Sequence, residues 1–201
     1  MKDSFVILLF FVAGLFAGYA NLIPESIDYD RAGEVVLYIM MFFVGLTLSL
    51  DRKLWQDLSF IKPVFFVLPL ITIVGTFVGV LAFHLIFQEV SLQNALAIGS
   101  GFGYYSLSSI LISEVAGKEM GIIALLANII RETLTLLMAP LFVRFFGPYA
   151  VITSAGATSM DTCLPVILKH SGKEFIILSV IHGILLSVFV PLFITFIYSI
   201  H

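Results

Sequence analysis

Two acidic side chains stand inside stretches that are otherwise apolar, and they are the first candidates for chemistry. Glu132 follows Arg131 near the centre of the apolar segment 119–146, and Asp161 lies in the segment 149–168. A charge at the centre of a bilayer costs about 2.5–3.5 kcal/mol on insertion scales, so such residues face the protein interior or a water-filled cavity. Two carboxylates can bind a cation or a proton, and the arginine can receive a carboxylate.

The residues around Glu132 form a polar stripe if the segment 119–146 is a helix. Asn128, Glu132 and Thr135 recur at helical spacing and share one face, with Arg131 beside them. Successive helical residues point about 100° apart, so Arg131 and Glu132 need not pair with each other. The alternative that stays open is a structural ion pair in which Glu132 only neutralises Arg131.

Asp161 is surrounded by small and hydroxyl-bearing residues rather than by the Leu and Val of a lipid-facing helix. The stretch is TSAGATSMDTCLP over 153–165, and it includes Thr158 and Ser159. Lipid would leave its backbone groups unsatisfied, so we expect a broken helix that is buried in protein or lines a cavity, as in the binding sites of secondary transporters. A plain helix cap formed by Asp161 is the alternative.

A second interrupted segment, 92–113, contains alternating glycines followed by tyrosines and serines. Its hydroxyls and carbonyls are expected to form the opposite wall of the cavity; otherwise its glycines only permit close helix crossing. The residues expected to line the cavity are Gly101, Gly103, Tyr104, Tyr105, Ser106 and Ser108. His182, in a later apolar segment, is either a proton-relay member or a hydrogen-bonded interior histidine.

The composition supplies the membrane scaffold that these residues need. Apolar residues make up 60% of the 201 positions and charged residues 11%, whereas a soluble domain carries about 25% charged residues. We predict one all-α polytopic membrane domain over 1–201, with about five to seven transmembrane segments of about 20 residues, two of them broken or re-entrant. The predicted segments are 4–23, 33–50, 61–87, 92–113, 119–146, 149–168 and 174–199.

The distribution of charge predicts the orientation and excludes several functions. The loops 51–62 and 169–173 carry lysine or arginine and are placed in the cytoplasm, which makes the N-terminus cytoplasmic and the C-terminus periplasmic. A net charge of -3 without a basic stripe gives no indication of nucleic-acid binding. The one cysteine, Cys163, excludes an internal disulfide. Without catalytic or metal-binding motifs, we expect no enzyme, no metal site and no cofactor.

Four motifs along the chain occur together in a known family. They are GFGYYSLSS at 101–109, the Arg-Glu pair at 131–132 with Ala139-Pro140 after it, GATSMDTCLPVI at 156–167 and IHGILLSVFVP at 181–191. Together, over nearly the whole chain, they closely resemble the C-terminal part of the LysO family of bacterial lysine exporters. The resemblance implies export of L-lysine, and of analogues such as thialysine, across the inner membrane. It also implies that the family's two essential acidic residues correspond to Glu132 and Asp161.

We therefore predict a secondary transporter that exports L-lysine, with protons as the exchanged ion. A cationic amino acid suits a site of two carboxylates and one arginine, and the carboxylates can carry protons on the return step. The predicted binding residues are Glu132, Asp161, Arg131, Asn128, Thr135, Ser159 and Thr158, with His182 as the candidate relay. The expected partners are L-lysine, protons and the lipid bilayer.

Members of the family usually carry an additional N-terminal portion of a few helices. We expect this chain to act as a homo-oligomer or with a separately encoded N-terminal half. Gly14-x-x-x-Gly18 and Gly75-x-x-x-Gly79 are candidate contact ridges, since small residues at this spacing let membrane helices approach closely. The alternatives are a subunit of a split transporter that is inactive alone, and a cation channel.

Overall fold

The computed structural model of the chain describes residues 63–200, together with scattered earlier positions at 9, 12–14, 16–20, 35, 39, 42 and 46. The predicted segments 4–23 and 33–50 lie largely outside the described residues, and so does the loop 51–62. The fold is therefore given for the region from residue 63 onward.

Three long helices run through this region, and each is long and apolar enough to cross a membrane. They are α4 (Val64–Ile86), α7 (Lys118–Phe146) and α10 (Ile176–Ser199), the last preceded by the 3-10 turn η2 (Lys173–Phe175). No other helix in the described residues meets both conditions. At 1.5 Å per residue, each exceeds the roughly 30 Å thickness of the hydrocarbon core. The predicted segments 61–87, 119–146 and 174–199 are confirmed.

Two hairpins with irregular tips lie between the long helices. The first joins α5 (Leu92–Gly99) to α6 (Tyr105–Ala116) through the loop 100–104. The second consists of α8 (Tyr149–Ala155), the 3-10 turn η1 (Gly156–Met160) and α9 (Leu164–His170). These hairpins are the two segments that the sequence predicted to be broken. No arm exceeds 12 residues, or about 18 Å, so a single arm is too short to cross a bilayer.

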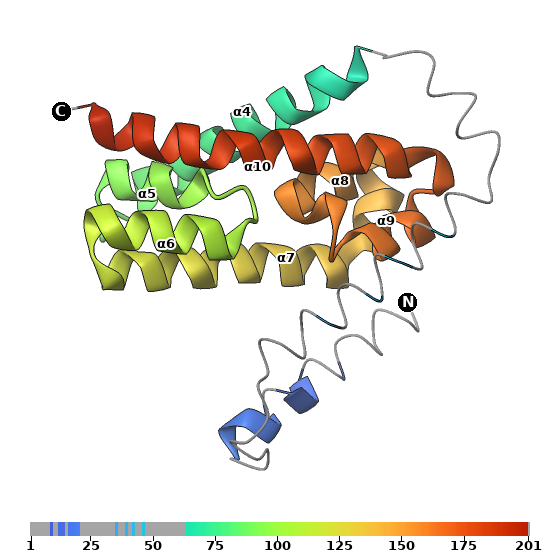
Figure 1. Cartoon of the computed structure of the whole chain (residues 1–201), viewed down its shortest axis with the longest axis horizontal. Coiled ribbons are helices and arrows are strands. Elements are labelled where there is room, and N and C mark those ends of the chain that lie inside the picture. The colour runs from blue at the N-terminus through green and yellow to red at the C-terminus, as the bar shows by residue number, and fades with distance from the viewer. Residues whose placement is uncertain are drawn as a thin grey trace.

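Both hairpins return to the end of the bundle from which they enter, and they enter from opposite ends (Figure 1). The hydroxyl of Ser171, just after α9, donates to the carbonyl oxygen of Pro148, just before α8, at 2.9 Å. At the other end of the bundle, the hydroxyl of Tyr198, late in α10, donates to Asn94 Oδ1, early in α5, at 2.9 Å. The sequence did not decide between crossing and re-entry, and the structure shows re-entry.

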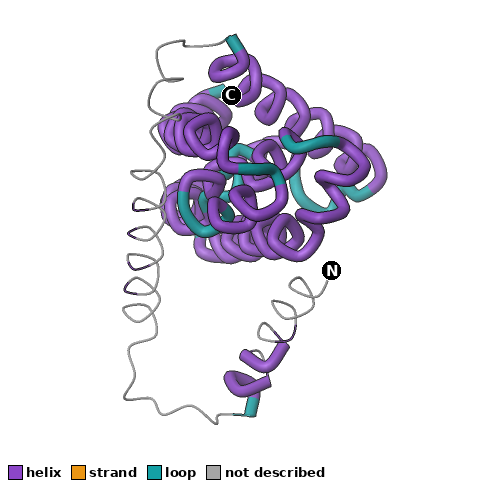
Figure 2. The backbone as a smooth tube through the Cα atoms, turned by 90° about the vertical axis from the view of Figure 1, so that its right-hand side faces the viewer, coloured by secondary structure: helices purple, strands orange, loops and turns teal. Residues whose placement is uncertain are grey.

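The chain therefore contains two units of a long helix followed by a re-entrant hairpin. α4 leads into the first hairpin, and α7, which runs in the opposite direction, leads into the second (Figure 1). Figure 2 shows the same helices along the long axis of the bundle. A pair of inverted units of this kind is a common construction of secondary transporters.

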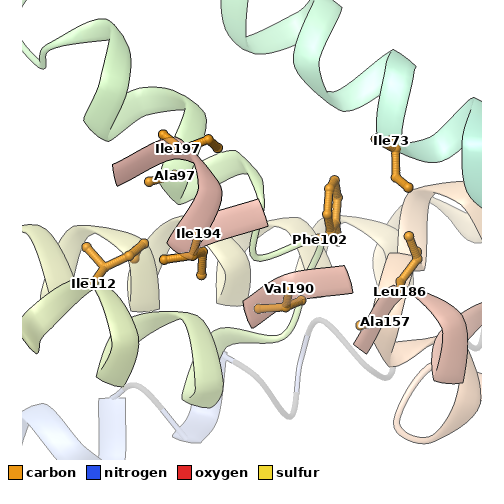
Figure 3. Packing of buried hydrophobic residues seen from close by; sticks show 10 residues of the cluster. Ile73, Ala97, Phe102, Ile112, Ala157, Leu186, Val190, Ile194 and Ile197 are labelled. Atoms are coloured by element: carbon orange, nitrogen blue, oxygen red, sulfur yellow. The ribbon is translucent and has the colours of Figure 1, made fainter. Parts of the chain in front are cut away.

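α10 is the helix against which both hairpins pack. The stretch from its middle to its C-terminal end shares an apolar cluster with the first hairpin, with α4 and with Ala157 of η1 (Figure 3), and Leu186, Val190 and Ile194 are almost fully buried there. Its first half contributes Leu178 to a separate cluster formed with the second hairpin. Burial on both hairpins gives α10 an apolar contact along its whole length, which fixes the two tips relative to each other.

Gly183 marks the point where α10 passes the tip of the second hairpin. A Cβ at this position would lie 2.6 Å from both the carbonyl oxygen of Ala157 and the Cβ of Met160. We expect Gly183→Ala to destabilise the protein by about 1–3 kcal/mol, the usual effect of overpacking a core. The measurement is the melting temperature of the detergent-purified protein. Gly79→Ala is the matched control, because a Cβ there meets nothing within 4 Å, and an unchanged melting temperature for both variants would contradict the packing.

Candidate functional site

The tips of the two hairpins touch each other near the centre of the bundle. The N–H of Ala157, in η1, donates to the carbonyl oxygen of Phe102, in the first tip, at 2.8 Å. Gly103 follows with a φ of 95°, and a Cβ on it would lie 2.8 Å from the carbonyl oxygen of Ala155. Only glycine adopts this conformation at so close an approach without strain. Irregular backbone of both hairpins thus meets midway along the long helices.

Phe102 is held in an unusual conformation at this contact. Among the described residues it is the one non-glycine residue with a positive φ, 44°. Its side chain is fully buried and makes edge-on ring contacts with Phe77 of α4 at 6.0 Å and with Phe193 of α10 at 5.9 Å. Such backbone strain costs about 1–3 kcal/mol, and aromatic pairs contribute about 0.5–1.5 kcal/mol each. The aromatic contacts therefore stabilise the tip in its strained form.

Asn128 of α7 satisfies the backbone of the first tip. Its side-chain oxygen accepts from the N–H of Gly103 at 2.7 Å, and its amide donates to the carbonyl oxygen of Ile98 at 3.3 Å. The same amide donates to the carbonyl oxygen of Ala124, one turn earlier in α7, at 2.9 Å. The break between α5 and α6 leaves the N–H of Gly103 and the carbonyl oxygen of Ile98 without their regular helical partners. The Asn128 side chain supplies hydrogen bonds to both groups.

Arg131 does the same for the second hairpin. Its Nε donates to the carbonyl oxygen of Ser154 at 2.9 Å and its Nη2 to that of Thr153 at 3.1 Å, while Nη1 donates to the Thr76 hydroxyl of α4 at 3.2 Å. The two carbonyls belong to the last turn of α8, which is the negative end of the helix dipole. Glu132 is not among these partners, so the structural ion pair between Arg131 and Glu132 that the sequence left open is not formed.

His182 of α10 holds the remaining part of the second tip. Its ring is fully buried; Nδ1 lies 3.0 Å from the Ser159 hydroxyl of η1, and Nε2 lies 2.9 Å from the Thr72 hydroxyl of α4. Ser159 also donates to the carbonyl oxygen of Ser179 at 2.9 Å. His182 therefore connects three elements, and every fully buried side-chain nitrogen and oxygen in the described region has a hydrogen-bond partner.

Glu132 and Asp161 approach each other through Thr162. Glu132 is only 8% exposed, and its Oε1 accepts a hydrogen bond from the Thr162 hydroxyl. Asp161 Oδ1 accepts from the Thr162 N–H at 2.6 Å and lies 3.3 Å from the same hydroxyl. Tyr105, at the start of α6, is half-buried. The arrangement is a compact acidic pair that can bind a cation.

The predicted binding residues fall into two groups. Glu132 and Asp161 form the acidic pair. The others hold the hairpins in place. Asn128, Arg131 and Thr158 bond to backbone groups of the hairpins. Ser159 bonds to His182 and to the carbonyl oxygen of Ser179, and Thr135 bonds to the carbonyl oxygen of Arg131 and to the Ser154 hydroxyl. The predicted shared face of α7 is present, because Asn128, Glu132 and Thr135 are all buried.

The first hairpin contributes less side-chain chemistry than the sequence suggested. Gly101 and Gly103 are buried in the tip, and Ser108 donates to the carbonyl oxygen of Tyr104 at 2.8 Å, within its own turn. Ser106 is exposed. The first hairpin therefore presents mainly backbone groups at its tip.

Sequence reasoning missed Thr162 as a site residue, and it missed the partners of Arg131. Thr162 follows Asp161 directly, so its position next to one carboxylate was visible in the sequence. Its bond to Glu132 was not, because the two residues are 30 positions apart and belong to different elements. Nothing in the sequence indicated that Thr76 binds Arg131, since it is a single hydroxyl-bearing residue in an apolar helix.

A cavity of about 470 Å³ lies on another side of α7, between α4 and α5. Its walls are mostly apolar and include Gly75 and Gly79, and Arg131, Asn128 and Thr76 form its polar part. Neither Glu132 nor Asp161 lines it. The cationic guanidinium and the acidic pair thus face different spaces, which separates the two charges that the sequence had placed in one site.

The fold and its buried polar centre define an all-α membrane protein built like many secondary transporters, with two broken elements meeting at the middle. The family model described as lysine exporter LysO matches residues 8–198. The chain belongs to this family.

Two relatives support the assignment. The chain is 30% identical over 196 residues to the lysine exporter LysO of Escherichia coli, an alignment that covers 98% of this chain and 63% of that protein. It is 31% identical over 161 residues to a Haemophilus influenzae protein named "Putative lysine exporter", covering 80% of this chain and 81% of the relative. The chain thus spans less than two thirds of the length of the Escherichia coli relative. No solved structure matches the chain.

The contacts of Arg131 predict that its loss affects the fold rather than substrate choice. Arg131→Met removes three donors and leaves two carbonyls of α8 unsatisfied, at about 1–3 kcal/mol each. Arg131→Lys restores part of the stability, because a single ammonium cannot reach all three partners at once. The measurements are the melting temperature and, in a flux assay, the ratio of lysine flux to the flux of 1,5-diaminopentane, which lacks the carboxylate. A variant that stays stable but loses this preference would show that Arg131 binds the substrate carboxylate.

Proposed function

We propose that this chain exports L-lysine across the bacterial inner membrane, with Glu132 and Asp161 as its cation-binding residues. The observation that carries the proposal is the meeting of these two carboxylates, one from the continuous helix α7 and one from the broken second hairpin. Membership of the lysine exporter family supplies the substrate class.

The acidic pair suits the ammonium groups of lysine. An ammonium has three donors and no acceptor, so it can bind oxygens of both carboxylates at once. A buried, doubly negative site without a cation is unfavourable, which gives the transporter a reason to take up either a lysine ammonium or protons. Thialysine carries a sulfur in place of one methylene and keeps the same charged groups, so we propose that it is exported as well.

The opposed hairpins suit alternating access to this site. Lys169 and Lys173 lie at the end of the bundle where the second hairpin enters, and because cytoplasmic loops carry an excess of basic residues, they support a cytoplasmic location for this end. The first hairpin then enters from the periplasm, and the C-terminal end of α10 is periplasmic. Movement of one hairpin against the long helices would open the acidic pair toward one side at a time.

An open helix face favours a second candidate, an oligomeric or multi-subunit transporter. The face of α4 that carries Gly75 and Gly79 is open, since a Cβ added to either glycine would meet nothing within 4 Å. Small residues at this spacing permit close packing of another membrane helix. The test compares lysine flux from the purified chain alone with flux after co-expression with a membrane subunit encoded by a neighbouring gene. Flux from the chain alone supports the first candidate, and flux that requires the second subunit supports a multi-subunit transporter.

The decisive variants are Glu132→Gln and Asp161→Asn, which remove charge while keeping shape. We expect each to lower lysine flux into inverted membrane vesicles by at least about tenfold, because a hydrogen bond to a charged group is lost. Glu119→Gln is the matched control: Glu119 lies in the first turn of the same helix, away from the acidic pair. Wild-type flux in both test variants would disprove the proposed site.

Proton exchange predicts a definite response to the pH gradient. In inverted vesicles, lysine should accumulate faster when the lumen is more acidic than the bath, because outward movement of protons drives lysine inward. An ionophore that removes the gradient should abolish the stimulation. A cation channel would give lysine flux that follows the lysine gradient and the membrane potential and is indifferent to pH, and that result would replace antiport with passive conduction.

A further inference from the structure

Thr162 is the residue through which the two halves of the acidic pair touch. Its hydroxyl donates to Glu132 Oε1 and lies 3.3 Å from Asp161 Oδ1, and its N–H donates to that same Asp161 oxygen at 2.6 Å. Within the described residues, the bond from Thr162 is the one hydrogen bond that the Glu132 side chain makes. Thr162 therefore contacts both carboxylates at once.

The contact joins two structural elements of different kinds. Glu132 belongs to the middle of α7, an uninterrupted helix of 29 residues. Asp161 and Thr162 belong to the short turn between η1 and α9, where the backbone of Asp161 leaves the helical region, with a φ of -132° and a ψ of -99°. If the second hairpin shifts against α7, the hydrogen bond from the Thr162 hydroxyl to Glu132 breaks, whereas Thr162 stays next to Asp161, its neighbour in the chain. The distance between the two carboxylates therefore depends on this contact.

A threonine hydroxyl has one hydrogen to donate and two lone pairs that accept. When both carboxylates are charged, the Thr162 hydroxyl donates its hydrogen to Glu132, and Asp161 accepts a hydrogen bond only from the Thr162 N–H. A proton on Glu132 reverses the bond, because the carboxylic acid then donates to Thr162 and frees the hydroxyl hydrogen for Asp161. A bound ammonium can likewise donate to the hydroxyl oxygen. The hydrogen-bond direction at Thr162 thus follows the occupant of the acidic pair.

We propose that Thr162 is a positioning residue that holds Glu132 and Asp161 as one cation site and couples its occupancy to the second hairpin. The inference rests on the proposed function of the acidic pair. Thr158, four residues earlier, has no such role, because its hydroxyl bonds to the carbonyl oxygen of Ala155 within the tip.

The first test compares side chains of equal shape. Thr162→Val keeps the volume and removes the hydroxyl, and we expect it to raise the KM for lysine by roughly ten- to a hundredfold, the effect of losing a hydrogen bond to a charged group. Thr162→Ser keeps the hydroxyl and should retain a KM near that of the wild type. Thr133→Val is the matched control, because Thr133 is half-buried next to Glu132 on α7 and lies outside the acidic pair. A purely structural role would lower the amount of folded protein and the maximal flux without moving KM.

A double-mutant cycle tests the contact without any transport. The melting temperatures of Thr162→Val, Glu132→Met and the double variant should be non-additive, since each single change already removes one partner of the bond. Additive effects would overturn the proposal. If Thr162→Val and Thr162→Ala both fail to fold while Thr162→Ser and Thr133→Val fold, the hydroxyl acts on folding, and the proposal is also overturned.

The outcomes separate this inference from the proposed function. If Glu132→Gln and Asp161→Asn leave lysine flux unchanged, the acidic pair is not the cation site and the proposed function fails. If those variants abolish flux while Thr162→Val has the KM of Thr133→Val, the acidic pair stands and the positioning role of Thr162 fails.

Discussion

The fold depends on one constraint, which is that irregular backbone at membrane depth must find its hydrogen bonds within the protein. Both hairpins end in such backbone, and their tips meet where the N–H of Ala157 donates to the carbonyl oxygen of Phe102. Side chains of the long helices bind further groups of the hairpins: Asn128 binds backbone of the first tip, Arg131 binds carbonyl oxygens at the end of α8, and His182 binds the Ser159 hydroxyl of the second tip. Each long helix must therefore keep its rotation and depth relative to the tips.

This constraint explains why one stretch of α7 carries so much of the polar chemistry. Asn128, Arg131 and Glu132 lie within little more than one helical turn, yet they point to the first hairpin, to the second hairpin and to the acidic pair, respectively. A helix displays successive residues in different directions, so one turn can reach three neighbours. The acidic pair is thus held by the same turn of α7 that binds both hairpins.

The position of Arg131 changes the electrostatic picture of the site. A guanidinium bound to carbonyls at the C-terminal end of α8 is stabilised by the helix dipole and needs no carboxylate. Arg131 therefore does not pair with Glu132, which agrees with the proposal that the acidic pair binds a cation. The opposed entry of the two hairpins adds a structural basis for access from either side.

The sequence by itself determined the membrane class, the three long spans, the two breaks and the shared face of Asn128, Glu132 and Thr135. These features follow from composition and from the helical repeat, which are local properties of the chain. Only the tertiary structure decided that the broken segments re-enter from opposite ends, because a crossing pair and a re-entrant hairpin leave the later helices on the same sides. It also decided the partners of Arg131 and the bridge from Thr162 to Glu132. Arg131 binds backbone carbonyls, and because every residue has one, the sequence does not indicate which of them it binds. Thr162 donates to a carboxylate 30 residues away in the sequence, and only the packing of the second hairpin on α7 brings the two side chains together.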